Sequence, residues 1–192
     1  LVAGNRVGRR PNPLAPLSVM VFAEAAAEAG LPDGVMNVVI EGGIEGAQLM
    51  TTDPRVDLVS FTGSCTVGAK VAEQAAPTLK RLVLELGGKS AAIFLPDAAE
   101  RAAAHGLQVC TAHAGQGCVL GTRDFVPEDQ KAKVLEAMAA AVANVKIGPA
   151  SDPETQLGPV ISAGQRMRCE HFTRAAVTMG GLTVAGGKRP AH

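Results

Sequence analysis

The sequence predicts an α/β fold with mostly parallel sheets and flanking helices, and three observations support this prediction. Short apolar runs alternate with longer helical stretches along the 192 residues, which is the pattern of strand–helix–strand units. Gly-rich turns follow several of the apolar runs, as at strand-to-helix connections. At 47% hydrophobic and 19% charged residues, the composition is that of a globular chain that can bury a core.

The predicted elements follow in order from the N-terminus. Val7-Gly8 lies in a predicted buried strand although arginines surround it, so either the arginines sit at its solvent end or the strand is compromised. Apolar residues at helical spacing predict a helix over 17–29, with Gly30 as its cap. The further predicted strands are 35–40, 56–61, 82–86, 91–95, 122–126 and 182–184. Residues 62–64 are predicted to open a helix that runs to about residue 76. The other predicted helices are 44–50, 98–113, 130–145 and 165–179.

Charge and composition exclude several classes of protein. Lys plus Arg and Asp plus Glu are both 18, and Trp and Tyr are absent, so neither a basic surface nor aromatic stacking points to a nucleic acid. Charged residues break the apolar runs short of a membrane span, and no secretory signal opens the chain, which begins without Met as if in mid-strand. The four cysteines show no CxxC spacing, which favours a reducing, cytoplasmic setting over a disulfide scaffold.

The segment 61–68, Phe-Thr-Gly-Ser-Cys-Thr-Val-Gly, joins a predicted strand to a predicted helix. The N-terminus of such a helix presents N–H groups to an anion, and glycines let a diphosphate approach the backbone closely. The alternative is an ordinary glycine turn closed by a Ser cap. The short pattern alone leaves both interpretations open.

The segment 84–90, Leu-Glu-Leu-Gly-Gly-Lys-Ser, places a carboxylate between leucines. Its Gly-Lys-Ser end does not make a P-loop, because Val83 stands where that loop needs a glycine. Burial between the leucines would raise the pKa of Glu85 and suit it to act as a general base. The alternative is a strand-end Glu that faces solvent.

The segment 115–118, Gly-Gln-Gly-Cys, ends in a candidate nucleophile. A cysteine after a Gly-rich turn can be exposed and activated by backbone dipoles, whereas the alternative for Cys118 is a small buried apolar residue. His113 could pair with Cys118, but no third orienting group is evident and a helix-end cap is the favoured role. The buried interpretation is preferred for the other cysteines, which lie on predicted helices: Cys65, Cys110 and Cys169.

The order and spacing of these three motifs closely resemble the aldehyde dehydrogenase superfamily. Phe-Thr-Gly-Ser-x-x-Val-Gly comes first, then Leu-Glu-Leu-Gly-Gly-Lys-Ser, then Gly-Gln-x-Cys. Glu85 follows Ser64 by 21 residues and precedes Cys118 by 33, as the family pattern leads one to expect within a residue. The likeness runs from about residue 4 to about residue 187 and includes the segments 28–39 and 155–162.

The resemblance implies a Rossmann-like cofactor part followed by an α/β catalytic part. Residues 1–86 would be the C-terminal half of the dinucleotide-binding domain, and residues 87–192 a truncated catalytic domain. The implied enzyme oxidises a small-molecule aldehyde to a carboxylic acid with NAD or NADP. Cys118 is its nucleophile, which forms first a thiohemiacetal and then a thioester, and Glu85 is the general base. The Cys118 backbone N–H supplies half of an oxyanion hole, and Leu86 contacts the nicotinamide side. No metal is implied, and the whole protein is expected to be a homo-oligomer. The implied cofactor-binding residues are Arg10, Pro11, Gly43, Phe61, Thr62, Gly63, Ser64, Val67, Leu86 and Gly87.

Three departures from the family pattern bear on specificity. Where the family has Lys-Pro and soon a Glu that hold the adenosine ribose, this chain has Arg10-Pro11-Asn12-Pro13. Arg is not equivalent to Lys at a demanding site, and losing the carboxylate while gaining Arg could favour a 2′-phosphate, so we hypothesise tolerance of NADP. His113 stands where many members have Asn. Thr111 and Ala112 stand where bulky substrate-pocket residues are frequent.

The resemblance also implies that the chain is an internal piece, because family members are more than twice as long. The first half of the cofactor domain, the Asn that completes the oxyanion hole and a later Glu-x-Phe segment are expected outside it. Three hypotheses remain: a region of an aldehyde dehydrogenase, a non-catalytic remnant or partner-binding fragment, and a cofactor-independent thiol esterase. Arg9, Arg10 and Pro13 give the remnant some support. Glu85, Cys118 and the Gly63-Ser64 turn favour the enzyme.

Overall fold

The computed structural model describes residues 1–190 and divides the chain into two compact units, one from Leu1 to Leu86 and one from Gly87 onward. Within the described residues every strand pairs with a parallel partner, in three separate two-stranded sheets. Helices follow the strands in both units. The predicted α/β class with parallel strands and flanking helices is therefore confirmed, although the strands do not join into one sheet.

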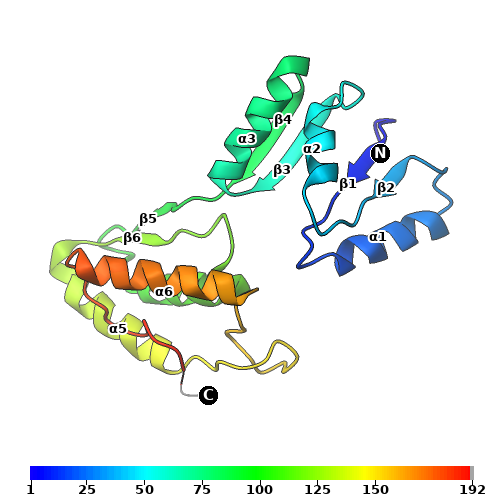
Figure 1. Ribbon diagram of the computed structural model, residues 1–192. Helices are drawn as coiled ribbons and strands as arrows, with labels where there is room; N and C mark the ends of the chain where they lie inside the picture. The colour runs from blue at the N-terminus through cyan, green and yellow to red at the C-terminus, as the bar shows by residue number, and fades with distance from the viewer. Residues whose placement is uncertain (191–192) are drawn as a thin grey trace. The chain divides into compact units, whose positions relative to one another are not determined.

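The first unit consists of two strand pairs and the helices beside them (Figure 1). In Figure 1, α1 lies beside the first pair and α3 lies along the second. Within each pair the two strands are parallel, so their carboxyl ends lie at the same edge of that pair. The elements are β1 (Val7–Arg9) paired with β2 (Met36–Val38), β3 (Leu58–Gly63) paired with β4 (Arg81–Leu86), the helices α1 (Leu17–Glu28), α2 (Glu45–Thr52) and α3 (Cys65–Ala75), and the short 3₁₀ turn η1 (Ala76–Thr78).

The arginine-rich start forms a strand despite its charges. Val7 is half-buried, whereas Arg9 is exposed and its guanidinium lies 5.7 Å from the ring centroid of Phe22 on α1. Arg10, just beyond β1, pairs with the carboxylate of Glu41. Each of these two arginines thus meets solvent, an aromatic face or a carboxylate, and β1 keeps its backbone pairing with β2.

The core of the first unit lies between α3 and the β3–β4 pair. Val71 and Ala75 on α3 are buried, and a Cβ added at Gly68 would lie 2.7 Å from Leu86 Cδ2. Glycine therefore allows the helix to approach β4 closely at this point. Helix α2 joins the same core through Thr51, whose Oγ1 lies 2.6 Å from Gln74 Oε1 on α3.

A buried lysine holds the turn that leads from α2 into β3. Lys80 is 9% exposed, and its ammonium donates hydrogen bonds to the carbonyl oxygens of Asp53 and Val56, the latter at 2.7 Å. Removing a donor from buried carbonyls leaves them without a partner, which costs about 1–3 kcal/mol.

Replacing Lys80 with methionine is expected to lower the free energy of unfolding by about 1–3 kcal/mol, because both carbonyls lose their donor. Urea unfolding followed by circular dichroism measures the change, since the chain has no Trp or Tyr as a fluorescent probe. Lys70→Met is the matched control, because Lys70 is exposed on α3. Equal losses of stability in the two variants would contradict the role of Lys80.

The second unit contains one strand pair and three helices in the part of it that the structure describes (Figure 1). Helix α4 packs on α5 through buried Ala102, Ala103 and Val134. Among residues 1–190 no helix is both long and apolar enough to cross a membrane. The elements are β5 (Ala91–Ile93) paired with β6 (Arg123–Phe125), the helices α4 (Ala102–Thr111), α5 (Lys131–Ala143) and α6 (Ala163–Thr178), and the 3₁₀ turns η2 (Ala99–Arg101), η3 (Ala112–Gly115) and η4 (Glu128–Gln130).

One predicted element of the second unit is wrong, and another forms with different ends. The predicted strand 182–184 does not form: Leu182 is 85% exposed, and no strand within the described ranges pairs with it. An isolated strand lacks the hydrogen-bonded partner that would stabilise it. The predicted helix 98–113 begins as the turn η2 and its α-helical part ends at Thr111, because His113 and Ala114 adopt left-handed backbone conformations at φ 49° and 53°.

Candidate functional site

The carboxyl edge of the β3–β4 pair brings the first two motifs together. The strands are parallel and in register, with Thr62 opposite Glu85 and Gly63 opposite Leu86. The backbone then leaves β3 into α3 at Ser64 and leaves β4 at Gly87. In open parallel sheets, ligands bind outside the carboxyl ends of the strands, so this edge is the candidate cofactor site of the first unit.

The N-terminus of α3 fits an anionic group such as a diphosphate. Ser64 is the N-cap, and its Oγ accepts a hydrogen bond from Val67 N at 3.3 Å. The first turn of α3 carries no acidic side chain, so no carboxylate there opposes an anion at the positive end of the helix dipole. A Cβ at Gly63 would lie 2.4 Å from Phe61 Cζ, so the Phe61 ring would have to move to admit a side chain at this turn. The Ser cap and the anion site are compatible interpretations.

Glu85 is exposed, which agrees with the strand-end interpretation of this position rather than with a carboxylate buried between leucines. Along β4, exposed and half-buried residues alternate, so Leu84 and Leu86 face inward and Glu85 faces outward. Side chains alternate across a strand with period two, and neighbours in sequence therefore lie on the opposite face. The carboxylate is therefore accessible at the carboxyl edge of the β3–β4 pair.

The carboxyl edge of the β1–β2 pair holds an ion pair that the sequence patterns did not reveal. Arg10 Nε donates to Glu41 Oε1 at 2.8 Å, and Arg10 Nη2 donates to the carbonyl oxygen of Gly43 at 2.6 Å. The side chains of Arg10 and Glu41 are 21% and 15% exposed, and Pro11 is buried beside them. The predicted residues Arg10, Pro11 and Gly43 are thus brought together around Glu41.

Glu41 also closes the N-terminus of α2. Its carboxylate accepts hydrogen bonds from Gly46 N at 2.7 Å and Ala47 N at 3.1 Å. The Gly46 N–H bond, together with Arg10 and the Ala47 N–H, holds the pKa of the Glu41 carboxyl below its ordinary value, against an opposing effect of burial. An acidic residue just after a parallel strand is a known signal of a ribose contact, and this signal could have identified Glu41.

Cys118 lies on a sharply turned loop between α4 and β6. His113, Ala114 and Gly115 adopt consecutive left-handed conformations with φ of 49°, 53° and 72°. Such conformations strain non-glycine residues by about 1–3 kcal/mol each, and α4 has already ended at Thr111 where they begin. Cys118 follows Gly115 by three residues and is exposed.

The side-chain amide of Gln116 holds this loop through two hydrogen bonds. Its amide nitrogen donates to His113 O at 3.0 Å, and its amide oxygen accepts from Ile161 N at 3.1 Å. His113 itself lies beyond α4 in the turn, and its carbonyl also accepts from Gln116 N at 3.1 Å. The described role of His113 is therefore a turn position rather than a partner of the Cys118 thiol.

A His–Asp pair connects the two elements that flank the Cys118 loop. His105 Nδ1 on α4 lies 3.1 Å from Asp124 Oδ1 on β6. The Phe94 and His105 rings meet edge-on, with their centroids 5.4 Å apart. Partial burial and the charge of Asp124 raise the pKa of the Cys110 thiol. The sequence analysis missed this pair, because its members are 19 residues apart and share no local pattern.

The four cysteines are all exposed, so the expectation that Cys65, Cys110 and Cys169 are buried apolar residues is wrong. Cys169 illustrates the reason, because no residue of α6 is buried. Helix position alone therefore does not separate Cys118 from the other thiols; the strained loop around it does.

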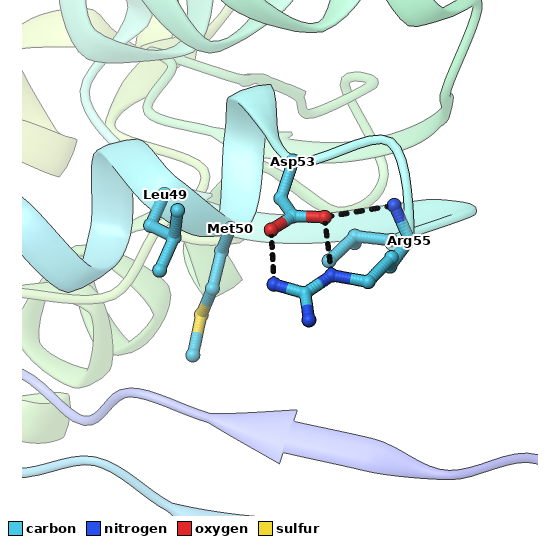
Figure 2. A pocket seen from close by; sticks show the side chains of 5 residues that line it. Leu49, Met50, Asp53 and Arg55 are labelled. Carbon is cyan, nitrogen blue, oxygen red and sulfur yellow. Dashed lines mark hydrogen bonds and ion pairs between the residues drawn. The ribbon is translucent and has the colours of Figure 1, made fainter.

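A hollow at the end of α2 is a weaker candidate for the site. It encloses about 290 Å³ between Leu49, Met50, Asp53, Arg55 and Val56 (Figure 2). The Arg55 side chain donates to the Asp53 carboxylate at 2.9 and 2.6 Å, and these bonds, with one from the Arg55 backbone, hold the pKa of Asp53 well below its usual range. The carboxylate is thus neutralised, and the predicted site residues lie elsewhere.

Comparison with known proteins matches the whole chain to one family. Residues 1–192 match the aldehyde dehydrogenase family. Betaine aldehyde dehydrogenase 2 of Rhizobium meliloti is 40% identical over 186 residues, which cover 96% of this chain and 38% of that protein. A mutant aldehyde dehydrogenase C of Pseudomonas syringae, solved in complex with NAD⁺ and octanal, is 37% identical with a TM-score of 0.92, over 97% of this chain and 39% of that one.

A third solved structure agrees with these two. The aldehyde dehydrogenase of Bartonella henselae is 33% identical with a TM-score of 0.94, over 99% of this chain and 40% of that one. The chain thus spans about two fifths of the length of the relatives it matches. The predicted motifs, the parallel α/β fold and the match over all 192 residues agree, and the chain belongs to the aldehyde dehydrogenase family.

Proposed function

We propose that this chain is the part of an NAD(P)-dependent aldehyde dehydrogenase that carries its nucleophile, Cys118, and its general base, Glu85. Residues 1–86 serve as the C-terminal half of the dinucleotide-binding domain, and residues 87–192 as the cysteine-bearing part of the catalytic domain. The complete enzyme acts on a small-molecule aldehyde, as a homo-oligomer in a cytoplasmic setting. The relative whose structure was solved with NAD⁺ and octanal supports this class of cofactor and substrate.

The chemistry follows from the two side chains. The Cys118 thiolate attacks the aldehyde carbon, and the backbone N–H of Cys118 donates to the oxyanion that forms. A bound nicotinamide would supply the hydride acceptor for this carbon, and loss of the hydride would leave a thioester on Cys118. Glu85 then takes a proton from a water molecule that attacks the thioester, which releases the carboxylic acid and the thiol.

One observation supports the proposal most directly: the in-register carboxyl edge of β3 and β4. There the Gly63-Ser64 turn opens α3 to an anion, and the exposed carboxylate of Glu85 stands opposite Thr62 in the neighbouring strand. The proposed anion site and the proposed general base thus lie at the same edge of the β3–β4 pair. The residues that would lie against the diphosphate are Gly63 and Ser64, whereas Leu86, at the end of the neighbouring strand, would contact the nicotinamide side of the cofactor.

Site-resolved thiol labelling of the 192-residue chain tests the proposal. Cys118 is expected to react at least about tenfold faster than Cys110, whose raised pKa leaves less thiolate at neutral pH. Adding NAD or NADP is expected to change the rate at Cys118 and to leave Cys169 on α6 unchanged. Mass spectrometry of peptides separates the four exposed sites, and Cys118→Ala identifies the fast one.

The two other hypotheses predict different outcomes. Equal labelling of all four cysteines, indifferent to either dinucleotide, would mean that the motifs persist in a non-catalytic remnant. Fast Cys118 labelling that ignores both dinucleotides, with hydrolysis of an activated ester that Cys118→Ala abolishes, would identify a thiol esterase instead.

A further inference from the structure

The carboxyl edge of β1 and β2 presents a charge arrangement that bears on the choice between NAD and NADP. The two dinucleotides differ only at the adenosine ribose, where NADP carries a 2′-phosphate and NAD a 2′-hydroxyl. A carboxylate accepts a hydrogen bond from the hydroxyl and repels the phosphate, whereas an unpaired Arg attracts the phosphate. The sequence shows Arg10 and no nearby Glu in the chain, which is why it suggested tolerance of NADP.

The fold supplies the missing carboxylate from a distant position. Glu41, 31 residues after Arg10, accepts Arg10 Nε at 2.8 Å. Parallel pairing of β1 with β2 brings the two together, because each lies just beyond the carboxyl end of its strand. A second bond, from Arg10 Nη2 to Gly43 O, orients the guanidinium toward the β2–α2 connection. Arg10 is therefore not a free cation.

Resting on the proposed function, we propose that Glu41 makes the site select NAD over NADP. It neutralises Arg10 and places a carboxylate where a 2′-phosphate would have to lie. Arg10 and Pro13 alone predict tolerance of NADP, whereas the Arg10–Glu41 pair predicts a preference for NAD.

The two helix ends of the first unit support this division of roles. The α2 end is occupied by carboxylates, since Glu41 accepts from Gly46 N and Ala47 N and Glu45 accepts from Ile44 N at 2.9 Å. The α3 end carries no carboxylate in its first turn. An anion is thus favoured at α3, where the diphosphate is proposed, and disfavoured beside α2, where NADP would add a phosphate.

Binding of NADH and NADPH to the 192-residue chain tests the selection. The emission of the reduced dinucleotides reports binding, and the chain has no Trp or Tyr that would interfere. The wild type is expected to bind NADH about tenfold more tightly than NADPH, and Glu41→Gln to tighten NADPH by about tenfold or more, as for one charge-assisted hydrogen bond gained. Glu45→Gln is the matched control: it removes the same charge from the same helix end, from a side chain whose described bond goes to Ile44 N.

Arg10→Gln tests the pair from the other side, and circular dichroism checks that each variant is folded. The preference for NADH should follow the net charge of the pair: lowest in Glu41→Gln, intermediate in the wild type and highest in Arg10→Gln. Equal affinities of the wild type for the two dinucleotides, or equal effects of Glu41→Gln and Glu45→Gln, would overturn the selection by Glu41 alone. Failure of the wild type to bind either dinucleotide would overturn the proposed function and the selection together.

Discussion

Replacing Cys118 with alanine is expected to abolish aldehyde oxidation, lowering kcat/KM by at least about a thousandfold, because the variant has no nucleophile to form the thioester. The assay follows reduced cofactor in the complete gene product that contains residues 1–192. Cys118 is the cysteine that the left-handed turn at His113, Ala114 and Gly115 delivers to the surface. The effect should fall on kcat, since alanine leaves the proposed cofactor site on the first unit intact.

Cys169→Ala provides the matched control for this prediction. Cys169 is also exposed, but it lies within the regular helix α6, and its loss is expected to change kcat/KM by less than about twofold, as for an ordinary surface substitution. Activity that survives in Cys118→Ala, or that disappears equally in Cys169→Ala, would be incompatible with Cys118 as the nucleophile.

Replacing Glu85 with glutamine is expected to slow turnover by about 10²–10⁴-fold, the usual contribution of a general base. In the proposed mechanism Glu85 acts on the thioester, so the first turnover should be preserved. Rapid mixing should then show a burst of reduced cofactor equal to the enzyme concentration, followed by a slow phase. Mass spectrometry should find the acyl group on Cys118 during that phase.

The control for this prediction is Glu73→Gln, an exposed carboxylate on α3, which should leave both phases unchanged. The prediction fails if Glu85→Gln slows the burst as much as the later phase, because Glu85 would then act before the thioester forms. The exposure of Glu85 at the end of β4 makes a folding defect from this isosteric change small.

The regular elements were largely predictable from local patterns. The helix 17–29 with its Gly30 cap, the Ser64-capped helix and the 82–86 strand all form within one or two residues of the prediction. Helical spacing, caps and apolar runs depend on neighbours in sequence, so they are visible without a fold. The strand 182–184 failed because a strand needs a partner, which local pattern cannot supply.

The candidate site was predictable in part. The motif order singled out Ser64, Glu85 and Cys118 as candidates and left open whether Glu85 is buried. The structure exposes Glu85, since the flanking leucines face the other side of the strand. Three cysteines on helices were expected to be buried and are exposed. Few apolar side chains of the described residues are fully enclosed, so being on a helix does not guarantee burial here.

The sequence by itself determined the family, the α/β class and the chemical identities of the candidate nucleophile and base, because these depend on residue types at fixed spacing. The tertiary structure alone decided what each charge meets. It joined Arg10 to Glu41 across 31 residues, paired His105 with Asp124 and turned Glu85 outward. Parallel pairing and helix packing bring distant residues within hydrogen-bonding distance, and electrostatic partnerships depend on that distance rather than on separation along the chain.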